Sequence, residues 1–215
     1  MNAALEKLFV NNNGYLETKI LKKRSEFYQL KKMVEAGDAF ALKRGLYRLT
    51  QWDSNSELAE VCRIVDGGVV CLFSAWHFYE LTTFVPSKHY MAIPSKTKRI
   101  LPAFPPIELT YWKETSYQLG KVEVEQKEGL ITIYDIEKSV CDAIKFRNKV
   151  GEEQSAEVLK NYLKRSDRNL DKLLKYARQL NVETVLQQQL KILVTQNSVK
   201  QSLLQSSRHN YADDF

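Results

Sequence analysis

Basic side chains are concentrated near the start of the chain, in a pattern that suits the binding of a polyanion. Residues 1–50 carry ten Lys/Arg and five Asp/Glu, whereas residues 51–215 carry 22 and 21. The stretch 19–48 alone holds nine basic and three acidic residues. DNA carries dense phosphate charge, and a protein that neutralises it gains free energy by counterion release. The charge pattern therefore favours a small nucleic-acid-binding module ahead of a larger, nearly neutral part.

Nine residues of this stretch have the chemistry needed to contact a DNA duplex. Lysine and arginine hold phosphates and set the register of a protein on DNA, whereas uncharged polar side chains can read base edges. We assign phosphate contacts to Lys22, Lys23, Lys32, Lys43 and Arg44, place Arg24 in the same basic turn, and assign base contacts to Ser25, Tyr28 and Gln29. Glu26 weighs against this assignment, because its carboxylate favours a helix start but repels phosphate.

Three helices and a hairpin are the elements that would position these side chains. Apolar residues at helical spacing predict helices over 3–10, 15–23 and 26–36. Two apolar runs, 38–42 and 46–50, flank the loop Lys43-Arg44-Gly45 and predict a β-hairpin. This order is the outline of a winged helix-turn-helix over residues 1–50. It would place the basic residues on a turn, on one helix face and at the hairpin tip.

The third predicted helix would be the one that enters the major groove. Ser25 is its expected N-cap and Gly37 its expected stop. Phe27, Leu30 and Val34 are expected to pack on the first two helices, which leaves the polar face for DNA. A solvated basic helix in a winged helix that binds protein is the alternative interpretation.

The rest of the chain predicts a second domain over 57–194, reached through a polar linker over 51–56. Strands are predicted over 89–93, 107–112, 121–125 and 130–134, and helices over 57–65, 75–81, 135–149, 152–164, 170–180 and 182–194. The run 69–73 is a buried strand or the start of a buried helix. Residues 195–215 form a polar tail. The predicted fold class is α+β, a winged helix-turn-helix followed by a larger α+β domain that ends in a helical bundle.

No pattern of catalytic, cofactor-binding or metal-binding residues stands out, so we expect a protein that is not an enzyme. His77 lies between Trp76 and Phe78 and is interpreted as a packed histidine. Cys62, Cys71 and Cys141 fit no paired spacing and are expected to be reduced thiols. No signal peptide or membrane-spanning stretch is visible, which predicts a cytoplasmic location and no membrane partner. A second basic group, Lys88, Lys96, Lys98 and Arg99, would extend the DNA surface, bind a partner or form a solvated loop.

Several short motifs follow one another along the chain in an order that resembles the AbiEi-type antitoxins of the abortive-infection, type IV toxin–antitoxin systems. The first part carries a helix that ends in Leu30 and Gly37, at a longer spacing than the family's L-x-x-x-G, and then Arg44-Gly45-Leu46-Tyr47. The second part carries Ser74, Ala75, Leu81 and Thr82, then Y-M-A-I-P, then Glu137, Lys138, Ser139, Val140 and Asp142 as E-K-[ST]-V-x-D. The resemblance extends from about Leu5 to Leu193.

The resemblance implies a cytoplasmic antitoxin that also represses its own operon. Its winged helix would bind inverted repeats in the promoter, with two protomers on the operator. Its second domain would counter a nucleotidyltransferase-like toxin, with or without direct contact. A winged-helix transcriptional regulator with a ligand- or protein-sensing second domain is the alternative function.

Overall fold

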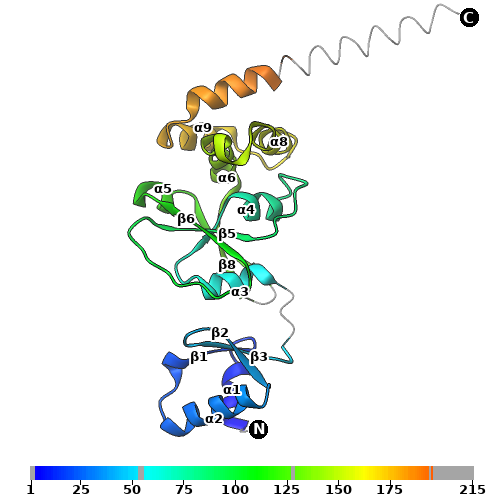
Figure 1. The fold of residues 1–215 in the computed structure, drawn as a ribbon. Coiled ribbons are helices and arrows are strands. Elements are labelled where there is room, and N and C mark those ends of the chain that lie inside the picture. Colours follow the sequence, from blue (N-terminus) through cyan, green and yellow to red (C-terminus); the bar gives the residue numbers. More distant parts are fainter. Residues whose placement is uncertain (1–2, 53–55, 127–128, 194, 196–215) are drawn as a thin grey trace, which may run out of the picture. The chain divides into compact units, whose positions relative to one another are not determined.

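The computed structural model describes residues 3–52, 56–126, 129–193 and 195, and its fold is α+β with two β-sheets (Figure 1). The chain divides into two compact units. The first contains Met1–Ala75 and Val85–Tyr134, and the second contains Trp76–Phe84 and the chain from Asp135 onward. Residues 53–55 of the predicted linker, and the predicted tail except Thr195, lie outside the described residues.

Residues 3–52, here called the N-terminal module, combine helices with a small antiparallel sheet. Its elements are α1 (Ala3–Val10), β1 (Tyr15–Glu17), the 3₁₀ helix η1 (Thr18–Ile20), α2 (Arg24–Glu35), β2 (Ala39–Lys43) and β3 (Leu46–Leu49). The strand order is β1-β3-β2, and both pairs are antiparallel. The predicted helix over 3–10 and the predicted hairpin are confirmed.

The helix predicted over 15–23 is wrong, because this segment forms β1 and η1. Tyr15 pairs with Arg48 and Leu16 with Tyr47, and both β1 residues are buried. Gly14 makes this strand start possible. Its φ is +79°, and a Cβ placed there would lie 2.1 Å from Cγ of Trp52. Trp52, which falls in the predicted linker, packs instead against the core of the module.

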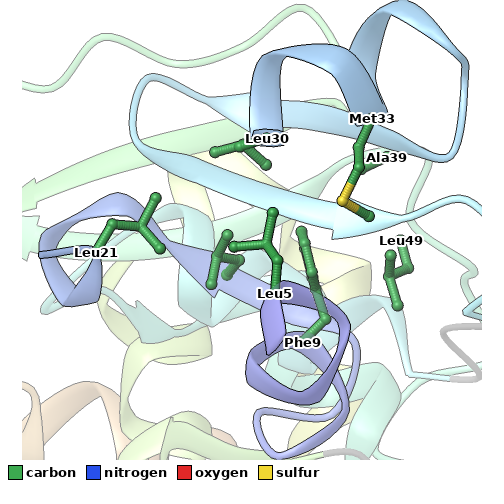
Figure 2. Close-up of a cluster of buried hydrophobic side chains, with 8 residues drawn as sticks. Leu5, Phe9, Leu21, Leu30, Met33, Ala39 and Leu49 are labelled. Atoms are coloured by element: carbon green, nitrogen blue, oxygen red, sulfur yellow. The ribbon is translucent and has the colours of Figure 1, made fainter. Parts of the chain in front are cut away.

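The module has an apolar core of its own. Side chains from α1, α2 and the hairpin strands point toward one another in Figure 2. The buried members are Leu5, Phe9, Leu16, Leu21, Leu30, Met33, Ala39 and Leu49. All of them belong to the module, so its elements are held together by contacts within residues 3–52. Apolar burial of this kind contributes roughly 25 cal/mol for each Å² removed from water.

The helix predicted over 26–36 is confirmed as α2, although its start and its buried face differ from the prediction. The helix begins at Arg24, with Lys23 at the N-cap position, so Ser25 is not the cap. Leu30 and Met33 are buried, whereas Phe27 is 46% exposed and Val34 37% exposed. The apolar spacing fits two neighbouring faces of the helix, and contact with α1 and the hairpin selects the one that contains Met33.

A five-stranded mixed sheet forms the remainder of the first unit. Its strands are β4 (Val69–Val70), β5 (His89–Pro94), β6 (Ile107–Trp112), β7 (Lys121–Gln126) and β8 (Gly129–Tyr134), in the order β6-β5-β4-β8-β7. The four predicted strands are therefore confirmed. Helix α3 (Glu57–Ile64), capped by Ser56, packs on β4 and β8. A short helix that was not predicted, α5 (Glu114–Gln118), lies close to β5.

The helix predicted over 75–81 is instead α4 (Leu72–Phe78), which resolves the run 69–73 into a two-residue strand followed by a helix start. Ser74 therefore lies inside α4. The interpretation of His77 as a packed histidine is wrong, because this residue is exposed while Trp76 is buried. A helix has one inward face, and Trp76 occupies it.

The second unit is a helical bundle centred on α6 (Ile136–Lys145), which Asp135 caps through a hydrogen bond from the Lys138 backbone N–H. The other helices are α7 (Arg147–Val150), α8 (Glu152–Leu163), α9 (Leu170–Gln179) and a helical stretch over 183–193. Helix α6 packs against both α8 and α9. The predicted helix over 135–149 thus divides into α6 and α7. The three cysteines are free thiols.

Candidate nucleic-acid interface

One face of α2 presents the side chains that we assign to DNA contact. Leu30 and Met33 fix the opposite face in the core. Ser25 is exposed, Tyr28 is 60% exposed, and Lys32 is exposed one turn further on. The Lys32 Nζ lies 4.9 Å from the centroid of the Tyr28 ring. Residues three and four apart share a helix face, so these three side chains form one continuous strip.

Gln29 is placed differently from the other candidates on α2. Its side chain is half-buried, at the border between the exposed strip and the core-facing side. It would reach a base edge only at the margin of a contact made by Ser25 and Tyr28. The structure therefore brings Ser25, Tyr28 and Lys32 together and leaves Gln29 beside them.

Three exposed cations lie at the start of α2, two in the turn before it and one at its first residue. Lys22, Lys23 and Arg24 are all exposed, and none of them forms an ion pair within the described part of the chain. Their charges are therefore available to a polyanion. Such contacts set affinity and register rather than sequence preference.

Glu26 has a defined structural role at the start of α2. Its Oε2 accepts hydrogen bonds from the backbone N–H groups of Lys23, at 2.9 Å, and Lys22, at 2.8 Å. These two backbone bonds lower the pKa of Glu26. A bound phosphate commonly uses such N–H groups at a helix start. Because the Glu26 carboxylate occupies two of them, a phosphate at this place would have to be held by the lysine and arginine side chains.

At the hairpin tip, Lys43 and Arg44 are adjacent in sequence but differ in exposure. Arg44 is exposed, whereas Lys43 is half-buried and its Nζ donates a 2.6 Å hydrogen bond to the backbone carbonyl of Ile64, at the end of α3. Burial lowers the pKa of Lys43. The tip is also held to the turn after β1, since the Thr18 N–H donates to the Gly45 carbonyl at 2.8 Å. In this conformation Arg44, and not Lys43, is free to meet a phosphate.

A recess lies between the hairpin tip and the end of α3. Its charged lining comprises Glu17, Lys19, Lys43, Arg44, Arg63 and Asp66. Lys19 pairs with Glu17 at 2.5 Å. The Arg63 guanidinium lies 4.6 Å from the centroid of the Tyr15 ring. Sequence reasoning did not single out Arg63, because no local pattern links it to Tyr15.

Two residues of the second basic group form polar contacts within the first unit, whereas the other two are exposed. The Lys88 Nζ pairs with Glu108 at 3.2 Å, and the Arg99 guanidinium donates to the Asp66 carbonyl at 2.8 Å. Lys96 and Lys98 are exposed. Two of the four cations are thus partly engaged within the first unit.

The motif around Ser74 and Thr82 holds parts of the fold together. The Ser74 Oγ accepts a 2.8 Å hydrogen bond from the Tyr90 N–H. The Thr82 hydroxyl donates to the Glu157 carboxylate at 3.0 Å and accepts from the Gln154 amide at 2.7 Å. Both motif hydroxyls are buried, and their hydrogen bonds satisfy groups that would otherwise lack a partner.

The later motif forms a buried polar network in the helical bundle. The Lys138 Nζ lies 2.7 Å from both carboxylate oxygens of Asp142, and the Lys138 residue has no exposed surface. Glu137 accepts a 3.2 Å hydrogen bond from the Tyr162 hydroxyl and lies 3.3 Å from the Lys172 Nζ. These residues bind one another, so their arrangement is structural.

Comparison with known proteins gives no family assignment, since neither a scan of protein-family models nor a search of curated proteins finds a match. No helix in the described ranges is long and apolar enough to cross a membrane. The same ranges contain no group of three or more His, Cys, Asp or Glu placed to hold a metal ion.

Proposed function

We propose that this protein is a DNA-binding regulator whose N-terminal module is a winged helix, and that it acts as the antitoxin of a type IV toxin–antitoxin system. The exposed strip Ser25, Tyr28 and Lys32 on α2, flanked by the cations Lys22–Arg24, is the observation that carries the DNA-binding part. The order of helix, strand, short 3₁₀ turn, helix and hairpin supports the assignment of α2 to the major groove.

The antitoxin part rests on the resemblance of the sequence motifs to AbiEi-type antitoxins. On this proposal the protein binds inverted repeats in its own promoter, with two protomers on the operator, and represses transcription. Its second part counteracts a nucleotidyltransferase-like toxin encoded beside it. A winged-helix regulator with a ligand- or protein-sensing second part is the competing function, and an adjacent nucleotidyltransferase gene would decide between them.

Duplex binding is tested with the upstream region of the protein's own operon, by fluorescence anisotropy over a range of salt concentrations. The double variant Lys22→Gln/Lys23→Gln should weaken binding across sequences and reduce the salt slope by about 2, which is roughly 1 for each lost phosphate contact. Lys96→Gln/Lys98→Gln removes the same charge outside the module and serves as the matched control. Equal weakening by both double variants would reject the assignment of the interface to α2 and its preceding turn.

Antitoxicity is tested separately in cells that express the neighbouring nucleotidyltransferase gene. The full-length variant Lys22→Gln/Lys23→Gln/Arg24→Gln should lose repression of a promoter reporter and still restore growth. This separation is expected because the three substitutions affect only exposed side chains of the N-terminal module. Growth arrest with wild-type protein present would reject the antitoxin proposal, whatever the result for DNA binding.

A further inference from the structure

The sheet of the N-terminal module is tied to α3 by a partly buried ionic network. The Arg48 Nη1 lies 2.5 Å from the Glu60 Oε2, and the Tyr15 hydroxyl donates to the same oxygen at 3.1 Å. The side chains of Arg48 and Glu60 are 21% and 8% exposed. Arg48 belongs to β3 and Tyr15 to β1, so both of these partners of Glu60 come from the module's sheet.

Two further contacts join the module to the end of the same helix, one from the hairpin tip and one from β1. Lys43 donates to the carbonyl of Ile64, and Arg63 lies over the ring of Tyr15. The module and α3 thus meet through long polar side chains. The contrast with the other side of α3 is clear, because that side packs closely on β4 and β8.

This contact is of a kind that can open without unfolding either partner. The apolar core of the module consists of its own residues, and the apolar side of α3 faces the five-stranded sheet. The docked arrangement also has a cost, since the Arg48 Nε is buried without an acceptor among the described residues. A buried ion pair repays its desolvation only when its geometry is good, so such a contact is finely balanced.

The docked hairpin conflicts with DNA contact by the hairpin tip. The Lys43 ammonium group has three N–H donors, but its side chain is half-buried and held at the end of α3 by the bond to the Ile64 carbonyl, and the end of α3 lies beside the tip that would approach the duplex. We propose that the hairpin–α3 contact is autoinhibitory: it holds the N-terminal module docked in the free protein, and duplex DNA binding releases it. This inference rests on the proposed DNA-binding function and adds a mode of regulation to it.

The release exchanges one set of polar partners for another. On undocking, Lys43 leaves a carbonyl oxygen and gains a phosphate, which is a stronger, charge-assisted partner. The apparent dissociation constant equals the intrinsic one divided by the fraction of protein in the competent, undocked state. Substitutions that weaken docking should therefore tighten DNA binding, although they lie outside the DNA-contact residues.

The test compares two carboxylates on α3 in the full-length protein. Glu60→Gln weakens the contacts with Arg48 and Tyr15, whereas Glu57→Gln removes the same charge at a side chain that is 74% exposed and lies 3.2 Å from the His89 Nε2. If the docked state predominates by about ten to one, Glu60→Gln should tighten binding to the operon's upstream duplex by roughly 10-fold. Glu57→Gln should change it much less. Equal effects of the two variants would overturn the inference, as would weaker binding by a folded Glu60→Gln protein.

A second variant and a readout that needs no DNA complete the test. Tyr15→Phe removes only the hydroxyl that reaches Glu60, and it should tighten binding in the same direction by a smaller factor. Hydrogen exchange of β3 and of the end of α3 should rise in both variants without DNA, and in wild type when the duplex is added. If hydrogen exchange is unchanged in both variants and in wild type with the duplex, the inference that this contact docks the module is overturned. Absence of duplex binding in wild type and both variants instead rejects the proposed function.

Discussion

The N-terminal module and the helical second unit use charged residues in opposite ways. Among the described residues of the module, no polar or charged side chain is counted with the buried ones. The helical unit buries seven: Thr82, Asp135, Glu137, Lys138, Ser139, Asp142 and Ser155. The module exposes the cations Lys22, Lys23, Arg24, Lys32 and Arg44 and bonds Lys43 and Arg48 to α3. The helical unit uses its buried charges to join its helices.

This difference separates the residues that carry a resemblance from the residues that would carry a function. In the helical unit, the motif residues Glu137, Lys138 and Asp142 are bonded within the fold. In the module, Ser25 and Tyr28 of the proposed contact strip lie outside the motifs, and Lys32 occupies an unspecified position between Leu30 and Gly37. In the helical unit these motif residues therefore serve the fold, and a function has to be sought on exposed surfaces.

Removing a buried charge from the helical unit should have the largest effect. We predict that Lys138→Met lowers the free energy of unfolding by about 3–5 kcal/mol, because it leaves the Asp142 carboxylate, 1% exposed, without its cation. Guanidinium unfolding followed by circular dichroism measures the change. The double variant Lys138→Met/Asp142→Leu should recover most of the loss, since it removes both charges together.

The exposed Lys160 of α8 provides the control for this substitution. Lys160→Met should change stability by no more than about 0.5 kcal/mol, as surface substitutions usually do. A similar loss for Lys138→Met and Lys160→Met would mean that the buried pair is not a structural element of the bundle. The contrast between the two regions would then lose its basis.

A smaller effect, with a defined pH dependence, is expected at Glu157 of α8. Burial alone raises the pKa of this carboxyl, but hydrogen bonds from Thr83, Thr82 and Gln154 outweigh it and lower the pKa below its usual value. A lowered folded-state pKa stabilises the protein above the unfolded value of about 4.3. This stabilisation is lost as the pH falls through the lower folded-state value.

Glu157→Gln should therefore cost about 1 kcal/mol near pH 6, the usual net contribution of such a bond. The difference from wild type should shrink as the pH is lowered from about 4 toward 2, as measured by urea unfolding. Glu153→Gln, an exposed position in the same helix, should match wild type at every pH. A Glu157→Gln deficit that stays constant with pH would show that the ionised carboxylate is not what the threonines bind.

The local sequence pattern predicted the elements of the module correctly where it was compatible with only one type of secondary structure. Helical spacing predicted the run that became α2, and two apolar runs around a glycine loop predicted the hairpin over 38–50; both are present. The segment 15–23 had two solutions, since Leu16, Ile20 and Leu21 fit a helix as well. Pairing of Tyr15 and Leu16 with β3, about thirty residues later, selected the strand. A sequence pattern cannot weigh such a distant partner.

The same limit applies to the candidate interface. Exposure of Lys22, Tyr28 and Lys32 follows from their places on a turn and on a helix face, and the sequence predicted it. The capture of Lys43 by the Ile64 carbonyl depends on how two segments 21 residues apart meet, and nothing in its neighbourhood indicates it. The exposure of a side chain is thus predictable where its position on its own helix or turn decides it. It is not predictable where the side chain bonds to an element distant in sequence.

The smallest effect on stability, with a clear effect on binding, is expected on the exposed strip of α2. Lys32→Gln should change the free energy of unfolding by no more than about 0.5 kcal/mol, because its contact with the Tyr28 ring is exposed. It should nevertheless weaken duplex binding across sequences and reduce the salt slope by about 1, since it removes one phosphate contact. Anisotropy titrations at several salt concentrations measure both quantities.

Lys31 is the matched control, because it is the adjacent residue on the same helix and carries the same charge. Its Nζ lies 3.6 Å from Glu35, and its side chain projects about 100° around the helix from Lys32. If α2 meets DNA through the strip of Ser25, Tyr28 and Lys32, Lys31→Gln should weaken binding less than Lys32→Gln does. If the two variants weaken it equally, only the net charge of the module matters. The module's exposed charges would then act as a general attraction for polyanions, without an oriented recognition helix.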